Sequence, residues 1–241
     1  MANPLQQFEV KTLIPIHMGG VDASFTNASM FMLFAVAGVA TFLMLSMRGR
    51  ALVPTRWQSM AELSYEFIAS MVRDNVGTEG RKYFPFIFSL FMFILFANLI
   101  GLLPYSFTFT SHIIVTFAMA ITVFLGVTVI GIVRHKLHFL SFFLPAGVPK
   151  IMAPILVPIE IVSYLSRPVS LSIRLFANMM AGHTMMKVFA GFVIPLGILG
   201  GWAPLAVDVA LTGFEFLVAF LQAYVFTILT CLYLNDAIHL H

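Results

Sequence analysis

The sequence predicts an all-α membrane protein, a single domain of about five membrane helices with one interfacial helix. Of the 241 residues, 60% are hydrophobic and only 10% are charged, whereas roughly a quarter are charged in an ordinary soluble domain. The mean hydropathy is +0.99, so the chain carries more apolar side chain than one soluble core could bury. Several apolar segments also reach the ~20 residues that span a hydrocarbon layer of ~30 Å. These observations exclude a soluble fold.

Charge and cysteine content exclude other classes of protein. The 13 lysines and arginines are scattered and form no basic stripe, so the net charge of +3 does not indicate nucleic-acid binding. Cys231 is the only cysteine, which excludes an internal disulfide and a thiolate metal cluster. No cofactor or metal is expected.

Three apolar segments predict the first membrane helices. They are residues 28–47, 83–103 and 112–133. The first is followed at once by Arg48, Arg50 and Arg56, and short basic loops stay on the cytoplasmic side of a membrane. We therefore expect the segment 1–27 outside and the C-terminus in the cytoplasm.

Residues 57–75 alternate apolar and charged side chains at helical spacing. Leu63 and Phe67 are apolar, while Glu62 and Glu66 are charged. This pattern is typical of an amphipathic helix, which we expect to lie along the cytoplasmic interface.

The two remaining apolar segments are too long to stand upright in a bilayer. Residues 151–190 would form a helix of ~60 Å, twice the hydrocarbon thickness, and residues 205–234 are also too long. The first segment is either strongly tilted or broken at Pro154, Pro158 and Pro168. We predict a tilted hairpin.

A polar stripe runs along the first of these long segments at spacings of three and four residues. It consists of Glu160, Ser163, Arg167, Ser170, Arg174 and Asn178. An arginine in mid-membrane costs roughly 2.5 to 3.5 kcal/mol, so Arg174 is a functional candidate. The alternative for Arg174 is a structural arginine paired with a carboxylate inside the bundle. The alternative for the stripe is a set of small residues that ease helix packing, which accounts for the serines but not for the two arginines.

A second polar line lies on the last segment, where Asp208, Glu215 and Gln222 recur every seven residues. Glu215 has no basic residue in its own segment, and His183 is its natural partner. His183 lies nine residues after Arg174, near the opposite face of its helix. A carboxylate beside an imidazole can relay protons. The alternative is a histidine that is simply packed and hydrogen-bonded.

Three blocks of sequence resemble subunit a of the rotary F-type ATP synthase, in its proteobacterial and mitochondrial forms. They are SRPVSLSIRLFANMMAG at 166–182, NLIGLLP at 98–104 and LQAYVF at 221–226. They occur in the family's order and with similar spacing, and the similarity extends from about residue 60 to the end. The first 50 residues are similar only loosely.

The resemblance implies roles for single residues. Arg174 matches the essential stator arginine, Asn178 and Gln222 match polar residues beside it, and Glu160 matches an acid near the cytoplasmic access path. His183 and Glu215 match a pair in the outer half-channel, with identities exchanged relative to many bacterial relatives, as in mitochondria. Asn98, Asp208 and Ser170 match positions that line the channel.

The resemblance also implies partners and a location. The partner facing Arg174 would be a ring of small proteolipid c subunits. The positive charge of Arg174 would favour proton loss from the ring carboxylates, because an opposite charge lowers a carboxyl pKa. Peripheral-stalk b subunits, the rest of the synthase and the lipid bilayer would complete the surroundings. The chain would catalyse no covalent chemistry itself and would lie in the bacterial inner membrane or, alternatively, the mitochondrial inner membrane.

Two other classes of protein stay open from the residues alone. A secondary transporter would carry a charged midplane site between repeated halves, but the Arg174 block has no second copy. A haem-binding membrane subunit would need facing histidines, for which His112 and His183 are the candidates. The acid and imidazole pair favours protons over Na⁺ as the transported ion. Na⁺ stays open as an alternative, because ion selectivity is largely a property of the ring.

Overall fold

The computed structural model describes residues 8–15, 17–18, 21–22, 24–48, 54–103, 106–136, 139 and 152–239. In this part of the chain, five helices are long and apolar enough to cross a membrane, which confirms the predicted fold class. They are α1 (Asn27–Met47), α3 (Phe84–Gly101, extended by the 3-10 helix η2, Thr78–Tyr83), α4 (Ile113–His135), α5 (Ala153–Val193) and α7 (Trp202–Ile238). Arg50, Pro104 and Ile151, used in the predictions above, lie outside the described residues.

The helix α2 (Arg56–Val76) has one buried and one exposed face, as an amphipathic helix should. Ile68 and Val72 pack into the core, whereas Leu63 is exposed. Its first turn is capped by the Thr55 hydroxyl, which accepts a hydrogen bond from the Gln58 N–H. It ends at Gly77, whose φ of 77° suits glycine best.

Short elements that the sequence did not predict connect the helices. In the N-terminal segment, β1 (Thr12–Ile14) pairs with β4 (Phe25–Thr26), and β2 (His17–Met18) pairs with β3 (Val21–Asp22), both antiparallel. The 3-10 helix η3 (Phe109–Ser111) precedes α4, and α6 (Gly197–Gly200) forms the turn between α5 and α7. These pieces are too short for hydropathy patterns to identify.

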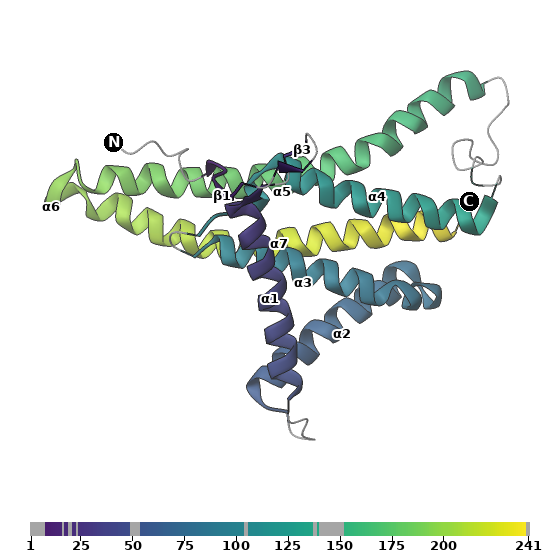
Figure 1. Ribbon diagram of the computed structural model, residues 1–241, viewed down its shortest axis with the longest axis horizontal. Helices are drawn as coiled ribbons and strands as arrows, with labels where there is room; N and C mark the ends of the chain where they lie inside the picture. Colours follow the sequence, from purple (N-terminus) through teal and green to yellow (C-terminus); the bar gives the residue numbers. More distant parts are fainter. Residues whose placement is uncertain are drawn as a thin grey trace.

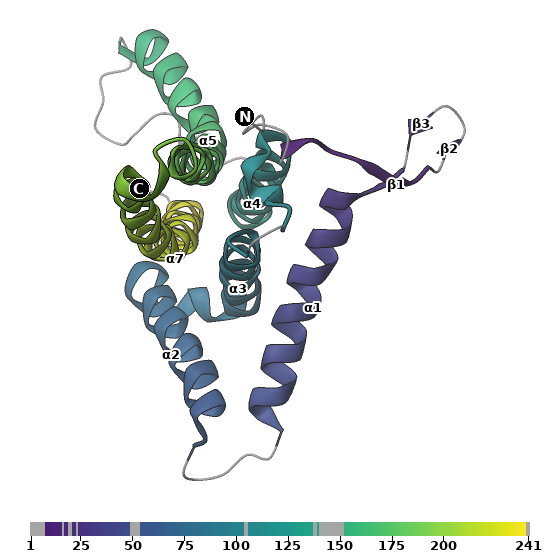
Figure 2. The ribbon, with the colours of Figure 1, turned by 90° about the vertical axis from the view of Figure 1, so that its left-hand side faces the viewer.

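The helices α3, α4, α5 and α7 run side by side along the longest axis of the molecule, and α1 crosses them (Figures 1 and 2). Within this bundle α5 packs on α4 and α7, and α3 packs on α7. The main core includes Phe91 of α3, Val123 of α4, Leu175 of α5 and Phe226 of α7. The hairpin of α5 and α7 is therefore transverse to α1, and its tilt relative to the membrane stays a prediction.

The helix α5 is continuous over 41 residues, which corresponds to ~60 Å. Pro154 lies in its first turn, where a missing N–H costs little, while Pro158 and Pro168 lie inside it. Figure 1 shows one bent helix rather than two. Of the two alternatives posed by its length, a broken helix is therefore wrong.

Candidate functional site

A carboxyl group and an imidazole meet inside the bundle, one from each long helix. His183 of α5 and Glu215 of α7 are both buried, and Glu215 is only 3% exposed. His183 Nε2 lies 3.9 Å from Glu215 Oε1, which is longer than a hydrogen bond and within ion-pair range. The expected proximity of the two side chains is found, whereas their joint role in proton transfer stays a prediction.

The imidazole is held by a residue that the sequence did not single out. Thr108, in the segment before η3, places its hydroxyl 3.0 Å from His183 Nε2. The same hydroxyl is 3.0 Å from the Gly101 carbonyl, to which it donates. Since that proton points at the carbonyl, the oxygen can accept from a protonated Nε2. This arrangement fixes the orientation of the ring beside Glu215.

The Glu215 carboxyl group is fitted closely against α5 at Gly182. A Cβ added to Gly182 would lie 2.8 Å from Glu215 Cδ and 3.3 Å from Glu215 Cγ. The lack of a side chain at Gly182 therefore lets the carboxyl group reach the surface of α5, next to His183.

Other polar atoms are buried in the bundle. Asn98 of α3 is fully buried and donates from Nδ2 to the carbonyl of Ala219, one turn after Glu215. Among the described residues, several buried side-chain atoms have no hydrogen-bond partner: Asn98 Oδ1, Thr110 Oγ1, His112 Nε2, Asp208 Oδ1 and both carboxyl oxygens of Glu215. Buried polar atoms are normally hydrogen-bonded, so the unsatisfied oxygens of Glu215 and Asn98 suit water or exchanging protons as partners.

Arg174 lies elsewhere, on the outer face of α5. It is exposed and, among the described residues, its guanidinium makes no hydrogen bond or ion pair. The alternative of an arginine paired within the chain is therefore not found for Arg174 in the described residues. Ser170 is exposed beside it, and Asn178 and Glu160 are half-buried. The structure separates an exposed arginine from a buried acid and imidazole pair, as their helical positions predict.

Gln222 of α7 is half-buried, and no hydrogen bond joins it to Arg174 among the described residues. Both helices carry large exposed apolar side chains near these polar groups, including Val169 and Ile173 on α5 and Leu217 and Leu221 on α7. The polar groups therefore stand on an apolar outer surface of the hairpin.

Arg167, the other arginine of the stripe, is ion-paired. Its Nη1 lies 2.9 Å from Oδ2 of Asp236 near the end of α7. This contact could not be predicted from the sequence, because the two residues lie 69 positions apart. The two arginines of the stripe therefore differ in their surroundings.

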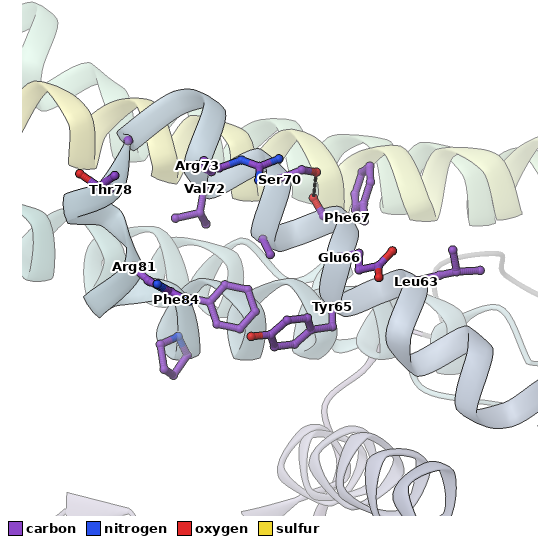
Figure 3. A pocket seen from close by; sticks show the side chains of 13 residues that line it. Leu63, Tyr65, Glu66, Phe67, Ser70, Val72, Arg73, Thr78, Arg81 and Phe84 are labelled. Carbon is purple, nitrogen blue, oxygen red and sulfur yellow. Dashed lines mark hydrogen bonds between the residues drawn. The ribbon is translucent and has the colours of Figure 1, made fainter. Parts of the chain in front are cut away.

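One cavity lies away from these residues, between α2, η2 and the start of α3 (Figure 3). It holds about 1090 Å³ and is lined by Tyr65, Glu66, Arg73 and Arg81, among others. None of the site residues expected from the sequence lines it. Among the described residues, no three His, Cys, Asp or Glu side chains are grouped to hold a metal ion.

Fold and site together define a polytopic helical membrane protein with ionisable groups inside its bundle and an exposed arginine on a long membrane helix. The chain belongs to the ATP synthase subunit a family, since the family model described as the ATP synthase A chain matches residues 29–235. This family differs from the transporter and haem-binding classes that the residues alone left open.

Proteobacterial relatives are similar over their whole length. ATP synthase subunit a of Paramagnetospirillum magneticum is 60% identical over 247 residues, covering 100% of both chains. The Pelagibacter ubique protein of the same name is 58% identical, covering 99% of this chain and 98% of its own. That of Rhodospirillum rubrum is 57% identical, again covering 100% of both.

Proposed function

We propose that the chain is the stationary, proton-conducting subunit of the membrane sector of an ATP synthase. It lies in the inner membrane of a bacterium with its N-terminus outside and its C-terminus in the cytoplasm. A ring of c subunits rotates against its α5 and α7 hairpin, and b subunits of the peripheral stalk hold it still. Proton flow through the chain drives the ring and, through it, ATP synthesis.

One observation carries this proposal: the Glu215 carboxyl group is buried beside His183 and has no hydrogen-bond partner among the described residues. An isolated carboxyl group inside a membrane protein is costly, and such groups mark ion pathways and proton relays. The imidazole of His183 is a group whose ordinary pKa suits proton exchange near neutral pH. Asn98 and Asp208 each carry a buried oxygen with no hydrogen-bond partner among the described residues, and we assign both to the outer half-channel.

Arg174 promotes the release of the proton from the ring carboxylate. Its fixed positive charge attracts an ionised ring carboxylate and favours the loss of its proton. It also separates the outer half-channel from the cytoplasmic one, which contains Glu160 and Ser170, and so blocks a direct leak. Asn178 and Gln222 lie on the same two helices and hydrate or orient the arriving carboxylate.

The membrane potential supplies the free energy for rotation. Each elementary charge that crosses 100 mV releases ~2.3 kcal/mol, several times RT, so the field can bias the direction of the ring. The chain itself forms and breaks no covalent bond.

The test is an exchange of the two buried groups in the assembled complex. Proton flux is measured in membrane vesicles carrying His183→Glu, Glu215→His and the double exchange. Each single change should slow flux, and the double exchange should recover part of it because it restores one acid and one imidazole. Losses in the double variant that simply multiply those of the single variants, with normal assembly, would show that the residues act independently.

A further inference from the structure

Arg167 and Arg174 lie on the same stripe of α5. They are seven residues apart, which places them two turns or ~10.5 Å apart along the helix and only ~20° apart around it. A partner that slides along this stripe would meet two positive charges rather than one. The surroundings of the two side chains differ, however, and the difference comes from α7.

Among the described residues, a carboxylate and two aromatic rings lie against the Arg167 guanidinium. Its Nη1 is 2.9 Å from Oδ2 of Asp236, and its guanidinium carbon lies 5.0 Å from the ring centre of Tyr233 and 5.4 Å from that of Tyr164. Tyr233 and Asp236 are on α7, one turn apart. The Tyr164 hydroxyl is fixed in turn, 2.7 Å from the hydroxyl of Thr128 on α4.

This clamp removes most of the charge that Arg167 would present to a partner. The Arg167 side chain is only 21% exposed, and the opposite charge of a carboxylate at hydrogen-bond distance offsets most of its field at a distance of ~10 Å. Arg174 has neither an ion pair nor a hydrogen bond among the described residues. Among the described residues, the charge of Arg167 is therefore compensated by a carboxylate, whereas the charge of Arg174 is not.

We propose that Asp236 is a positioning residue for the ring: by neutralising Arg167, it leaves Arg174 as the single point at which a ring carboxylate is attracted. This inference rests on the proposed function, since it needs a carboxylate-bearing ring on the α5 face. Asp236 touches no transported proton and acts only through Arg167.

The size of the effect follows from Coulomb's law. At an effective dielectric constant of ~20, a second unit charge ~10 Å away changes the equilibrium for holding a carboxylate by a factor of ~10. Without Asp236, the stripe would hold the carboxylate over a longer path and release it more slowly. Rotation would slow although Arg174 itself is unchanged.

Two variants separate this charge effect from a purely structural tie between α5 and α7. Asp236→Asn and Arg167→Gln break the same ion pair, but only Asp236→Asn leaves an additional cation on the stripe. ATP-driven proton pumping per assembled complex should fall about tenfold in Asp236→Asn and stay within about twofold of wild type in Arg167→Gln. The double variant should pump like Arg167→Gln, and Asp236→Glu should pump like wild type.

A matched control is Glu79→Gln, which breaks the exposed Glu79–Arg134 ion pair away from the stripe and should leave pumping unchanged. Equal losses in Asp236→Asn, Arg167→Gln and the double variant would overturn the proposal, and so would wild-type pumping in Asp236→Asn. Should Asp236→Asn fail to assemble, Arg167→Gln decides alone, since a tenfold loss there would show a structural tie.

Arg174→Ala in the same vesicles separates this inference from the proposed function. Normal pumping in Arg174→Ala refutes the proposed function, whereas lost pumping leaves the outcome to the Asp236 variants.

Discussion

Gly182→Ala should disable the buried pair without weakening the helix that carries it. The added Cβ would lie 2.8 Å from Glu215 Cδ, whereas ordinary contacts begin at 3.4 Å, so the carboxyl group must move by at least 3.4 − 2.8 = 0.6 Å. Because these atoms lie at the end of a flexible side chain, the carboxyl group can move away at little cost in stability, whereas a displacement of ~1 Å from a working geometry can cost ~100-fold in rate. We expect proton flux to fall by a factor of roughly 10 to 100.

The assay is proton flux into vesicles, normalised to the amount of assembled complex. Gly191→Ala is the matched control on the same helix, since a Cβ there meets no atom within 4 Å. Alanine is the better helix former by ~1 kcal/mol, so loss of helix stability cannot explain a fall in flux in Gly182→Ala.

A second substitution tests the cause. Glu215→Asp shortens the side chain by ~1.5 Å and withdraws the carboxyl group from the new methyl group. The double variant should therefore lose less than the product of the two single losses. Wild-type proton flux in Gly182→Ala, with normal assembly, would refute the placement of Glu215 in the proton path.

Three other measurements test the hydrogen bond to His183, the tilt of the hairpin and the orientation of the chain. Thr108→Val removes the hydroxyl beside His183 Nε2, a hydrogen bond of ~1 kcal/mol, and should lower flux about fivefold in the vesicle assay. Polarised infrared spectroscopy of oriented bilayers should find α5 and α7 far from the membrane normal, and upright axes for both would contradict the length argument. In a Cys231→Ser background, Glu9→Cys should react with an impermeant thiol reagent from outside and His239→Cys from the cytoplasm, and the reverse pattern would invert the topology.

The elements that could be predicted from the sequence depend on local composition. Apolar length and helical spacing predict the five membrane helices and the amphipathic α2, and the structure confirms that fold class. The same spacing places Arg174 and His183 on opposite sides of α5, and they are exposed and buried respectively. The isolation of Glu215 within its own segment correctly indicated His183 as a neighbour.

The remaining features depend on contacts between distant segments. Asp236 meets Arg167 across 69 positions, and nothing near either residue indicates the other. Thr108 lies 75 positions from His183 in a connection with no periodic pattern. Gly182 resembles any small residue on a membrane helix until the structure places the Glu215 carboxyl group against it. The short N-terminal strands are two or three residues long and leave no measurable alternation.

The central claim is that this chain is a stationary subunit whose proton transport depends on Arg174. Its most direct test is a pair of measurements on Arg174→Ala in one preparation of vesicles. With assembly verified, ATP-driven proton pumping should be abolished because ring carboxylates are no longer drawn to release their protons. Arg174→Lys should restore pumping only in part, since lysine lacks the planar fork and loses its proton more readily. Passive proton conduction, measured after the catalytic sector is removed, should persist because the half-channels remain and the barrier between them is gone. Normal ATP-driven pumping by assembled Arg174→Ala complexes would contradict the proposed role of this chain.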